Sequence, residues 1–153
     1  MTYEQRYERT IAASPAVVFD AFTAEPGQRA FYDRDDEPGW IVETACDLRV
    51  GGVWRVRFGP PGATYEHRHV FRAVERPHRL AFVTTESGPG RPPFDFDVEI
   101  TFAARDGGCL MTMRQFGFDT AAERDLHGLG VPHAFDQLER VIHHDGRHGP
   151  WEA

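Results

Sequence analysis

The feature that most restricts the fold is the strict alternation of apolar and polar residues from Phe94 to Phe102. Every second residue there is aromatic or branched, and the residues between are acidic or Thr. A period of two is typical of a strand with one buried and one solvated face. The hairpin signal Asp106-Gly107-Gly108 leads into a further extended segment over 109–118. This region predicts an antiparallel sheet with one face covered by another element.

The C-terminal region has the pattern of the covering element. Thr120-Ala121-Ala122-Glu123 matches a capping box, in which Thr starts a helix and Glu occupies its third position. An apolar stripe at helical spacing follows, formed by Val131, Phe135, Leu138 and Ile142. Gly128, Gly130 and Pro132 interrupt it. We therefore expect a helix over 120–127, a kink, and a second helix over 132–144.

The remaining segments complete an α+β fold. Residues 3–11 alternate like a strand, Ser14-Pro15 is a helix start, and short helices are expected over 16–22 and 25–32. Further strands are expected over 40–48, 53–58, 65–74 and 80–86, and the segment 88–93 is expected to be a loop. A curved seven-stranded antiparallel sheet around a long C-terminal helix would bury both apolar faces. We assign one domain to residues 1–145 and a flexible tail to residues 146–153.

Charge and hydropathy exclude several classes of partner. The formal net charge is −7, and all 17 basic residues are Arg. Such a surface repels a phosphate backbone, so no nucleic-acid partner is expected. No apolar run approaches the ~20 residues needed for a membrane span, and the charged N-terminal segment does not resemble a signal peptide. Cys46 and Cys109 form no CxxC pair, which favours reduced thiols and a cytoplasmic location.

Three segments carry a family resemblance: 11–23 (IAASPAVVFDAFT), 47–55 (DLRVGGVWR) and 75–80 (ERPHRL). In this order they resemble the activator of heat shock protein 90 ATPase homologue family, within the SRPBCC (START-like, birch-pollen-allergen-like) superfamily, and the resemblance implies its helix-grip fold. The resemblance implies a pocket between the concave sheet and the terminal helix, often used for small apolar molecules. Where the family often has Trp, in an H-x-x-G-W pattern, this chain has Val131, which would widen the cavity. The separate chaperone-contacting domain of the eukaryotic co-chaperone has no room in 153 residues, so a chaperone partner is not favoured.

The expected pocket combines large apolar side chains with a few polar groups. Tyr65 and His67 share one strand face and are the best acid–base pair that we can nominate. Gln115 is an inward amide that needs a partner, and Glu86 is interpreted as a solvated rim residue. The expected ligand-binding residues are Trp40, Trp54, Tyr65, His67, Phe82, Phe96, Val98, Met113, Gln115, Val131 and Phe135.

His67 and His69 lie two residues apart, so both imidazoles could face the pocket. A third ligand would make a zinc or iron site, but no HExxH or facial-triad spacing accompanies the pair. The sequence-based expectation is therefore solvent-facing or hydrogen-bonded histidines, no metal site and no cofactor.

Three functions agree with these patterns. The leading interpretation is a protein that binds a small hydrophobic or aromatic molecule and is more a binder than an enzyme. The alternatives are a polyketide cyclase or dehydratase-like enzyme in the same cavity, and a co-chaperone-like interaction module with an exposed apolar patch. A homodimer stays open as an oligomeric state.

Overall fold

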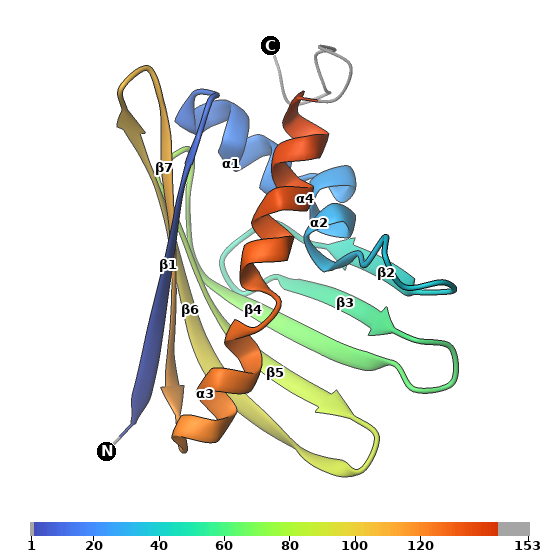
Figure 1. The fold of residues 1–153 in the computed structure, drawn as a ribbon. Coiled ribbons are helices and arrows are strands. Elements are labelled where there is room, and N and C mark those ends of the chain that lie inside the picture. The colour runs from blue at the N-terminus through green and yellow to red at the C-terminus, as the bar shows by residue number, and fades with distance from the viewer. Residues whose placement is uncertain (1, 144–153) are drawn as a thin grey trace.

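A computed structural model describes residues 2–143 of the chain, and one curved sheet dominates it (Figure 1). All its strands pair antiparallel, in the order β1-β7-β6-β5-β4-β3-β2. The helices lie on the concave side, as the helix-grip prediction required. The strands are β1 (Tyr3–Ile11), β2 (Ile41–Cys46), β3 (Val53–Gly59), β4 (Tyr65–Glu75), β5 (Arg79–Gly88), β6 (Arg91–Arg105) and β7 (Gly108–Phe118).

Two short helices follow β1, namely α1 (Pro15–Thr23) and α2 (Glu25–Tyr32). The Ser14 hydroxyl accepts a hydrogen bond from the Val17 amide at 3.2 Å, and Pro15 occupies the first helical position without sacrificing a donor. Phe19 and Phe22 of α1 are 1% exposed and pack edge-on against other core aromatic rings. These helices therefore fill one end of the concave face with protein atoms.

The C-terminal cover consists of α3 (Ala121–Gly128) and α4 (Val131–His143), which are separated by the predicted kink (Figure 1). Thr120 caps α3 by accepting from the Glu123 amide at 3.1 Å. The Glu123 carboxylate is bound by Arg91 at 2.7 Å, a contact with β6 that the local capping-box pattern could not reveal. Phe135 and Leu138 of α4 are buried in the core. The expected end of the last helix at residue 144 and the tail over 146–153 lie outside the described residues.

The expected loop over 88–93 is wrong. Gly88 still belongs to β5 and Arg91 already belongs to β6, so only a two-residue turn separates the strands. Pro92 and Pro93 are accommodated because β6 pairs only with β5 at this end, and the pairing with β7 begins at Asp97. The turn brings Arg91 beside the covering helix α3.

Candidate functional site

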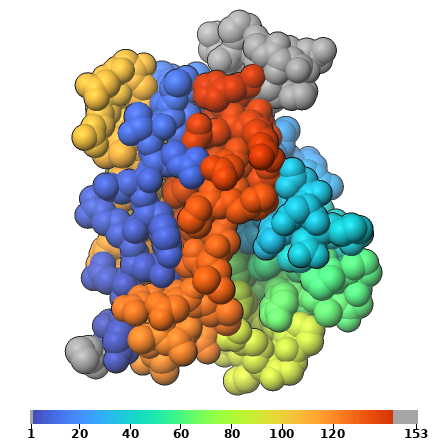
Figure 2. All heavy atoms as spheres, in the orientation of Figure 1, coloured from blue at the N-terminus to red at the C-terminus, as the bar shows by residue number. Residues whose placement is uncertain are grey.

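A pocket of about 340 Å³ lies between the sheet, α2 and the junction of α3 with α4. In Figure 2 the surface is hollowed where the orange α3–α4 junction meets the cyan and green segments. Phe31, Phe58 and Val131 contribute apolar wall, and Trp40 lies on the loop side. A second, smaller hollow of about 40 Å³ is lined by Trp54 and Phe82 and shares His67 and Gln115 with the first. Most space beneath α4 itself is filled by its own side chains, so the pocket sits under the kink.

The polar end of the pocket arises from the register of β4 and β5. His67 lies directly opposite Glu86, and His69 lies opposite Thr84. Side chains at opposed positions in an antiparallel pair are close enough to bond. His67 Nε2 is 2.6 Å from Glu86 Oε1, and His69 Nδ1 is 2.7 Å from Thr84 Oγ1. The bulge in β4 falls between Phe71 and Ala73, beyond both histidines, and the side chains of His67 and His69 are both buried.

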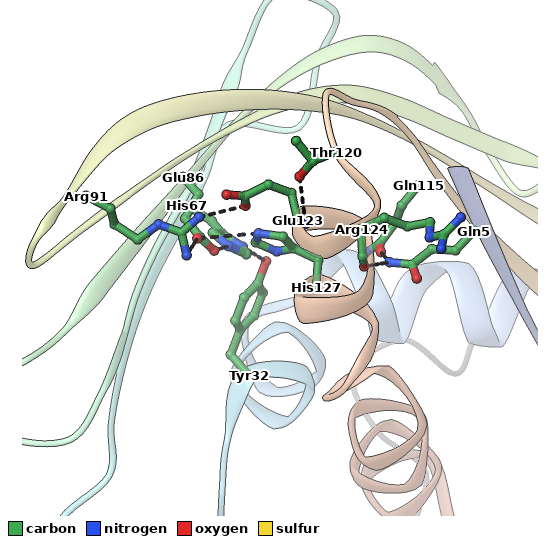
Figure 3. Close-up of polar contacts among 10 residues, drawn as sticks. All are labelled: Gln5, Tyr32, His67, Glu86, Arg91, Gln115, Thr120, Glu123, Arg124 and His127. Carbon is green, nitrogen blue, oxygen red and sulfur yellow. Dashed lines mark hydrogen bonds and ion pairs between the residues drawn. The ribbon is translucent and has the colours of Figure 1, made fainter. Parts of the chain in front are cut away.

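Tyr32, at the end of α2, joins the two histidines. Its hydroxyl is 2.8 Å from His67 Nδ1 and 2.9 Å from His69 Nε2 (Figure 3 draws the Tyr32–His67 contact). A hydroxyl donates one hydrogen bond and can accept others, so the hydrogen bonds that join His67, Tyr32 and His69 can run in two self-consistent directions. If the Tyr32 hydroxyl donates to His67 Nδ1, it accepts from His69 Nε2. If His67 Nδ1 carries a proton, that nitrogen donates to the Tyr32 oxygen, and Tyr32 donates to His69 Nε2. These hydrogen bonds fix the orientation of both imidazole rings.

Burial shapes the ionisation of this cluster. Loss of solvent raises the pKa of Tyr32 well above its ordinary value, and the nearby Glu86 charge adds to the rise. The same loss of solvent, together with His67, lowers the pKa of His69 well below its usual range. Burial alone would raise the pKa of Glu86, but the hydrogen bond from His67 and the charges of His67, His127 and Arg91 together lower it. The cluster thus holds an ionised Glu86 carboxylate and a neutral His69 imidazole.

The helix α3 closes this end of the pocket through His127 and two anchors. Arg91 Nη2 binds Glu123 Oε2 at 2.7 Å, and Arg91 Nη1 lies 3.8 Å from Glu86 Oε2. On the opposite side, Gln5 Nε2 donates to the Arg124 carbonyl at 2.6 Å (Figure 3). Between these anchors, His127 Nε2 lies 3.5 Å from Glu86 Oε2. Burial is the main reason that the pKa of His127 falls below its ordinary value.

The expected ligand-binding residues divide into three groups. The main pocket is lined by Trp40, Tyr65, His67, Gln115 and Val131, and the smaller hollow by Trp54, Phe82, Phe96, Val98 and Met113, with His67 and Gln115 lining both. Phe135 borders neither space and instead packs against Phe31, with ring centroids 6.0 Å apart. The Gln115 amide oxygen accepts from Gln5 Nε2 at 2.8 Å, while the one contact of its nitrogen among residues 2–143 is with Met113 Sδ at 3.9 Å. That nitrogen therefore retains donor capacity towards the pocket.

The interpretation of Glu86 as a solvated rim residue is wrong, since it is 6% exposed. Its parity with Phe82 and Thr84 in β5 was a usable signal, but the Gly-Pro-rich segment after it suggested an early strand end. Sequence reasoning also missed Tyr32, Arg91 and His127. Tyr32 ends α2, Arg91 begins β6 in a segment that was expected to be a loop, and His127 lies in α3. No local sequence pattern therefore connects them.

Within residues 2–143, no helix is long and apolar enough to cross a membrane. Among curated proteins, no relative matches this chain. Solved structures do share the fold, each at low sequence identity. A putative uncharacterized protein from Rhizobium leguminosarum is 20% identical, with a TM-score of 0.78 over 93% of this chain and 95% of that one. An AHSA1-like protein from Aeromonas hydrophila is 21% identical, with a TM-score of 0.68 over 94% of each chain.

The protein Ara h 8.0201 is 16% identical, with a TM-score of 0.67 over 93% of this chain and 98% of that one. These similarities establish the fold alone. A family model described as activator of Hsp90 ATPase homolog 1-like protein matches residues 12–143, which include every helix and every strand but β1 of the part of the chain that the structure describes. The chain therefore belongs to the activator of Hsp90 ATPase homolog 1-like family.

Proposed function

We propose that the chain binds a small, flat apolar molecule with one polar group, in the pocket under the α3–α4 kink. The observation that carries this proposal is a hollow of about 340 Å³ with aromatic and aliphatic walls and a buried polar cluster at one end. Ligand sites of roughly 300–1,000 Å³ commonly combine apolar walls with a few orienting polar groups. The side-chain nitrogen of Gln115, which can still donate a hydrogen bond, is one such group.

The pocket volume limits the size of the ligand. A cavity of about 150 Å³ accepts benzene, so this pocket suits about a dozen non-hydrogen atoms, such as two fused rings. At about 0.5 kcal/mol per atom, a dozen atoms give roughly 6 kcal/mol of binding free energy. We therefore expect dissociation constants in the range of tens of micromolar for well-fitting two-ring compounds.

Calorimetric titration of the full chain with a panel of naphthols, indoles and short fatty acids tests the proposal. The blocking variant is Val131→Trp, because Val131 is 5% exposed and lines the pocket. The matched control is Leu129→Trp, which adds the same side chain at a 79% exposed position. We expect at least ~10-fold weaker binding in the blocking variant and unchanged binding in the control. Absence of saturable binding by any panel member up to millimolar concentration, or equal affinities in both variants, would contradict the proposal.

A second candidate function is acid–base chemistry on the bound molecule. The observation that favours it is the contact between His67 and Glu86, with Tyr32 behind the imidazole, at the pocket wall. Such an orienting carboxylate and hydroxyl suit a histidine that transfers protons. Mass spectrometry of bound ligands after long incubation tests it. Conversion that is lost in His67→Asn while binding persists supports catalysis, and unchanged ligands throughout the panel argue for binding alone.

A further inference from the structure

Three side chains with metal-binding atoms converge at the polar end of the pocket. His67 comes from β4, Glu86 from β5 and His127 from α3, and one ligand atom from each lies within 4.8 Å of the others. We propose that His67 Nε2, the Glu86 carboxylate and His127 Nε2 bind a divalent transition-metal ion, with Zn²⁺ as the best-suited ion. The inference concerns the same pocket as the proposed function, but metal binding does not require the organic ligand.

The donor set and spacing suit such an ion. Two imidazoles and a carboxylate are a common three-ligand set for zinc, which takes nitrogen and oxygen donors at about 2.0–2.2 Å. Donors around a tetrahedral ion are then roughly 3.3 Å apart. The distance of 3.5 Å between His127 Nε2 and Glu86 Oε2 already fits. The contact between His67 Nε2 and Glu86 Oε1, at 2.6 Å, is shorter than this spacing and must lengthen when an ion binds between the two atoms.

An unpartnered nitrogen points independently to a ligand at this place. The His127 side chain is 8% exposed, and its Nε2 has no hydrogen-bond partner among residues 2–143. Its ring is held between phenylalanines, stacked on Phe118 at 5.6 Å and tilted against Phe96 at 4.8 Å. Buried polar atoms in native proteins nearly always have a partner. In Figure 3 this imidazole faces His67 and Glu86, so an ion between them would supply the missing partner.

The hydrogen bonds behind the proposed ligands fit metal binding. A metal-bound histidine usually donates its other ring N–H to an oxygen, which fixes the ring orientation. Here the Tyr32 oxygen lies 2.8 Å from His67 Nδ1 and can accept that hydrogen. Tyr32 then donates to His69 Nε2, which is the second self-consistent direction of the chain. His69 is therefore a supporting residue, since both its ring nitrogens are already engaged.

The local charge also favours a cation. Glu86 and Glu123 are two carboxylates, and among residues 2–143 Arg91 is the one guanidinium in contact with both. The Arg91 charge is directed mainly at Glu123, which it binds at 2.7 Å, against 3.8 Å for Glu86. The sequence offered no third ligand for His67 and His69, and for that reason we expected no metal site. The tertiary structure instead combines His67 with Glu86 and His127.

Calorimetric titration of the chelator-treated, untagged full chain with ZnCl₂ tests this inference. The background variant replaces His143, His144 and His148 by Asn, which removes histidines able to bind stray metal. We expect one Zn²⁺ per chain, a midpoint of unfolding raised by about 5 °C or more at saturating zinc, and Co²⁺ absorption typical of a four-coordinate ion. His127→Asn and Glu86→Gln should each weaken Zn²⁺ binding by at least ~100-fold. Circular dichroism verifies that both variants remain folded.

The matched control is His133→Asn, because His133 belongs to a second, more exposed group with Asp35 and Asp36. It should leave Zn²⁺ affinity unchanged. If a variant fails to fold, histidine ¹⁵N chemical shifts of the background protein give the same information, since zinc should move signals of His67 and His127 but not His133. Absence of Zn²⁺ binding up to millimolar concentration, or binding lost only in His133→Asn, overturns the inference. If zinc does not bind but organic ligands bind the metal-free protein, only the metal inference fails. If zinc binds but no organic ligand does, only the proposed function fails.

Discussion

Replacing Tyr32 by Phe tests whether the buried hydroxyl connects the two histidines as the geometry indicates. The hydroxyl is 2.8 Å from His67 Nδ1 and 2.9 Å from His69 Nε2. Its loss leaves both ring nitrogens, His67 Nδ1 and His69 Nε2, buried and unpaired, at a cost of about 1–2 kcal/mol for each. We therefore expect the free energy of unfolding to fall by about 2–4 kcal/mol.

The measurement is urea unfolding at pH 7.5, followed by circular dichroism, with thermal unfolding as a second measure. For a chain of 153 residues, the expected loss corresponds to a midpoint lower by roughly 5–12 °C. The matched control is Tyr65→Phe. Tyr65 is half-buried in the same pocket, and its hydroxyl forms no hydrogen bond with the residues that the structure describes. This control should cost less than about 0.5 kcal/mol.

Equal stabilities of Tyr32→Phe and Tyr65→Phe would refute the reasoning. That result would mean that the Tyr32 hydroxyl contributes no net stability and that the histidines are oriented by packing alone. Imidazole ¹⁵N shifts provide a second readout, since loss of the bridging hydroxyl should change the tautomer balance of both histidines. Shifts identical to those of the unmodified protein would point to the same conclusion.

Two further predictions concern packing. Gly128→Ala should lower the free energy of unfolding by about 1–3 kcal/mol, because the added methyl would overlap the Tyr7 hydroxyl, whereas Gly130→Ala, with nothing within 4 Å, should be nearly neutral. Similar unfolding midpoints for both variants in urea would contradict this account of α3 packing. Cys109 should resist thiol reagents at pH 8, because burial raises its pKa to about 11 and the residue is 0% exposed, whereas exposed Cys46 should react. Colorimetric titration should count one reactive thiol in the native protein and two in urea, and two rapidly reacting native thiols would show that β7 is less well packed than described.

The predicted elements depended on local patterns and were largely correct. Alternation over Phe94–Phe102 placed β6 and its buried face, and the Asp106-Gly107 turn adopts the positive φ values, 50° and 80°, that a tight hairpin needs. The glycines around residue 129 separated α3 from α4. Such signals act within a few residues, so they specify helix starts, turns and strand faces without knowledge of the rest of the chain.

Local sequence patterns could predict only part of the candidate site. Strand alternation left the face of His67 open, and the interpretation of 88–93 as a loop led us to place Glu86 at a solvated strand end, whereas both residues are buried. The partner of His67 depends on the β4–β5 register, which sets the contact with Glu86. Register is a property of two strands together, so a single strand pattern indicates a face but not a neighbour.

The amino-acid sequence by itself determined the helix-grip fold, because apolar periodicity specifies which faces must be buried. Only the tertiary structure decided the chemistry of the pocket. Arg91 binds Glu123 and thereby holds α3 against the sheet, which brings His127 to Glu86. The physical reason is that long-range polar contacts depend on where whole elements dock, and docking follows from the packing of all their side chains at once.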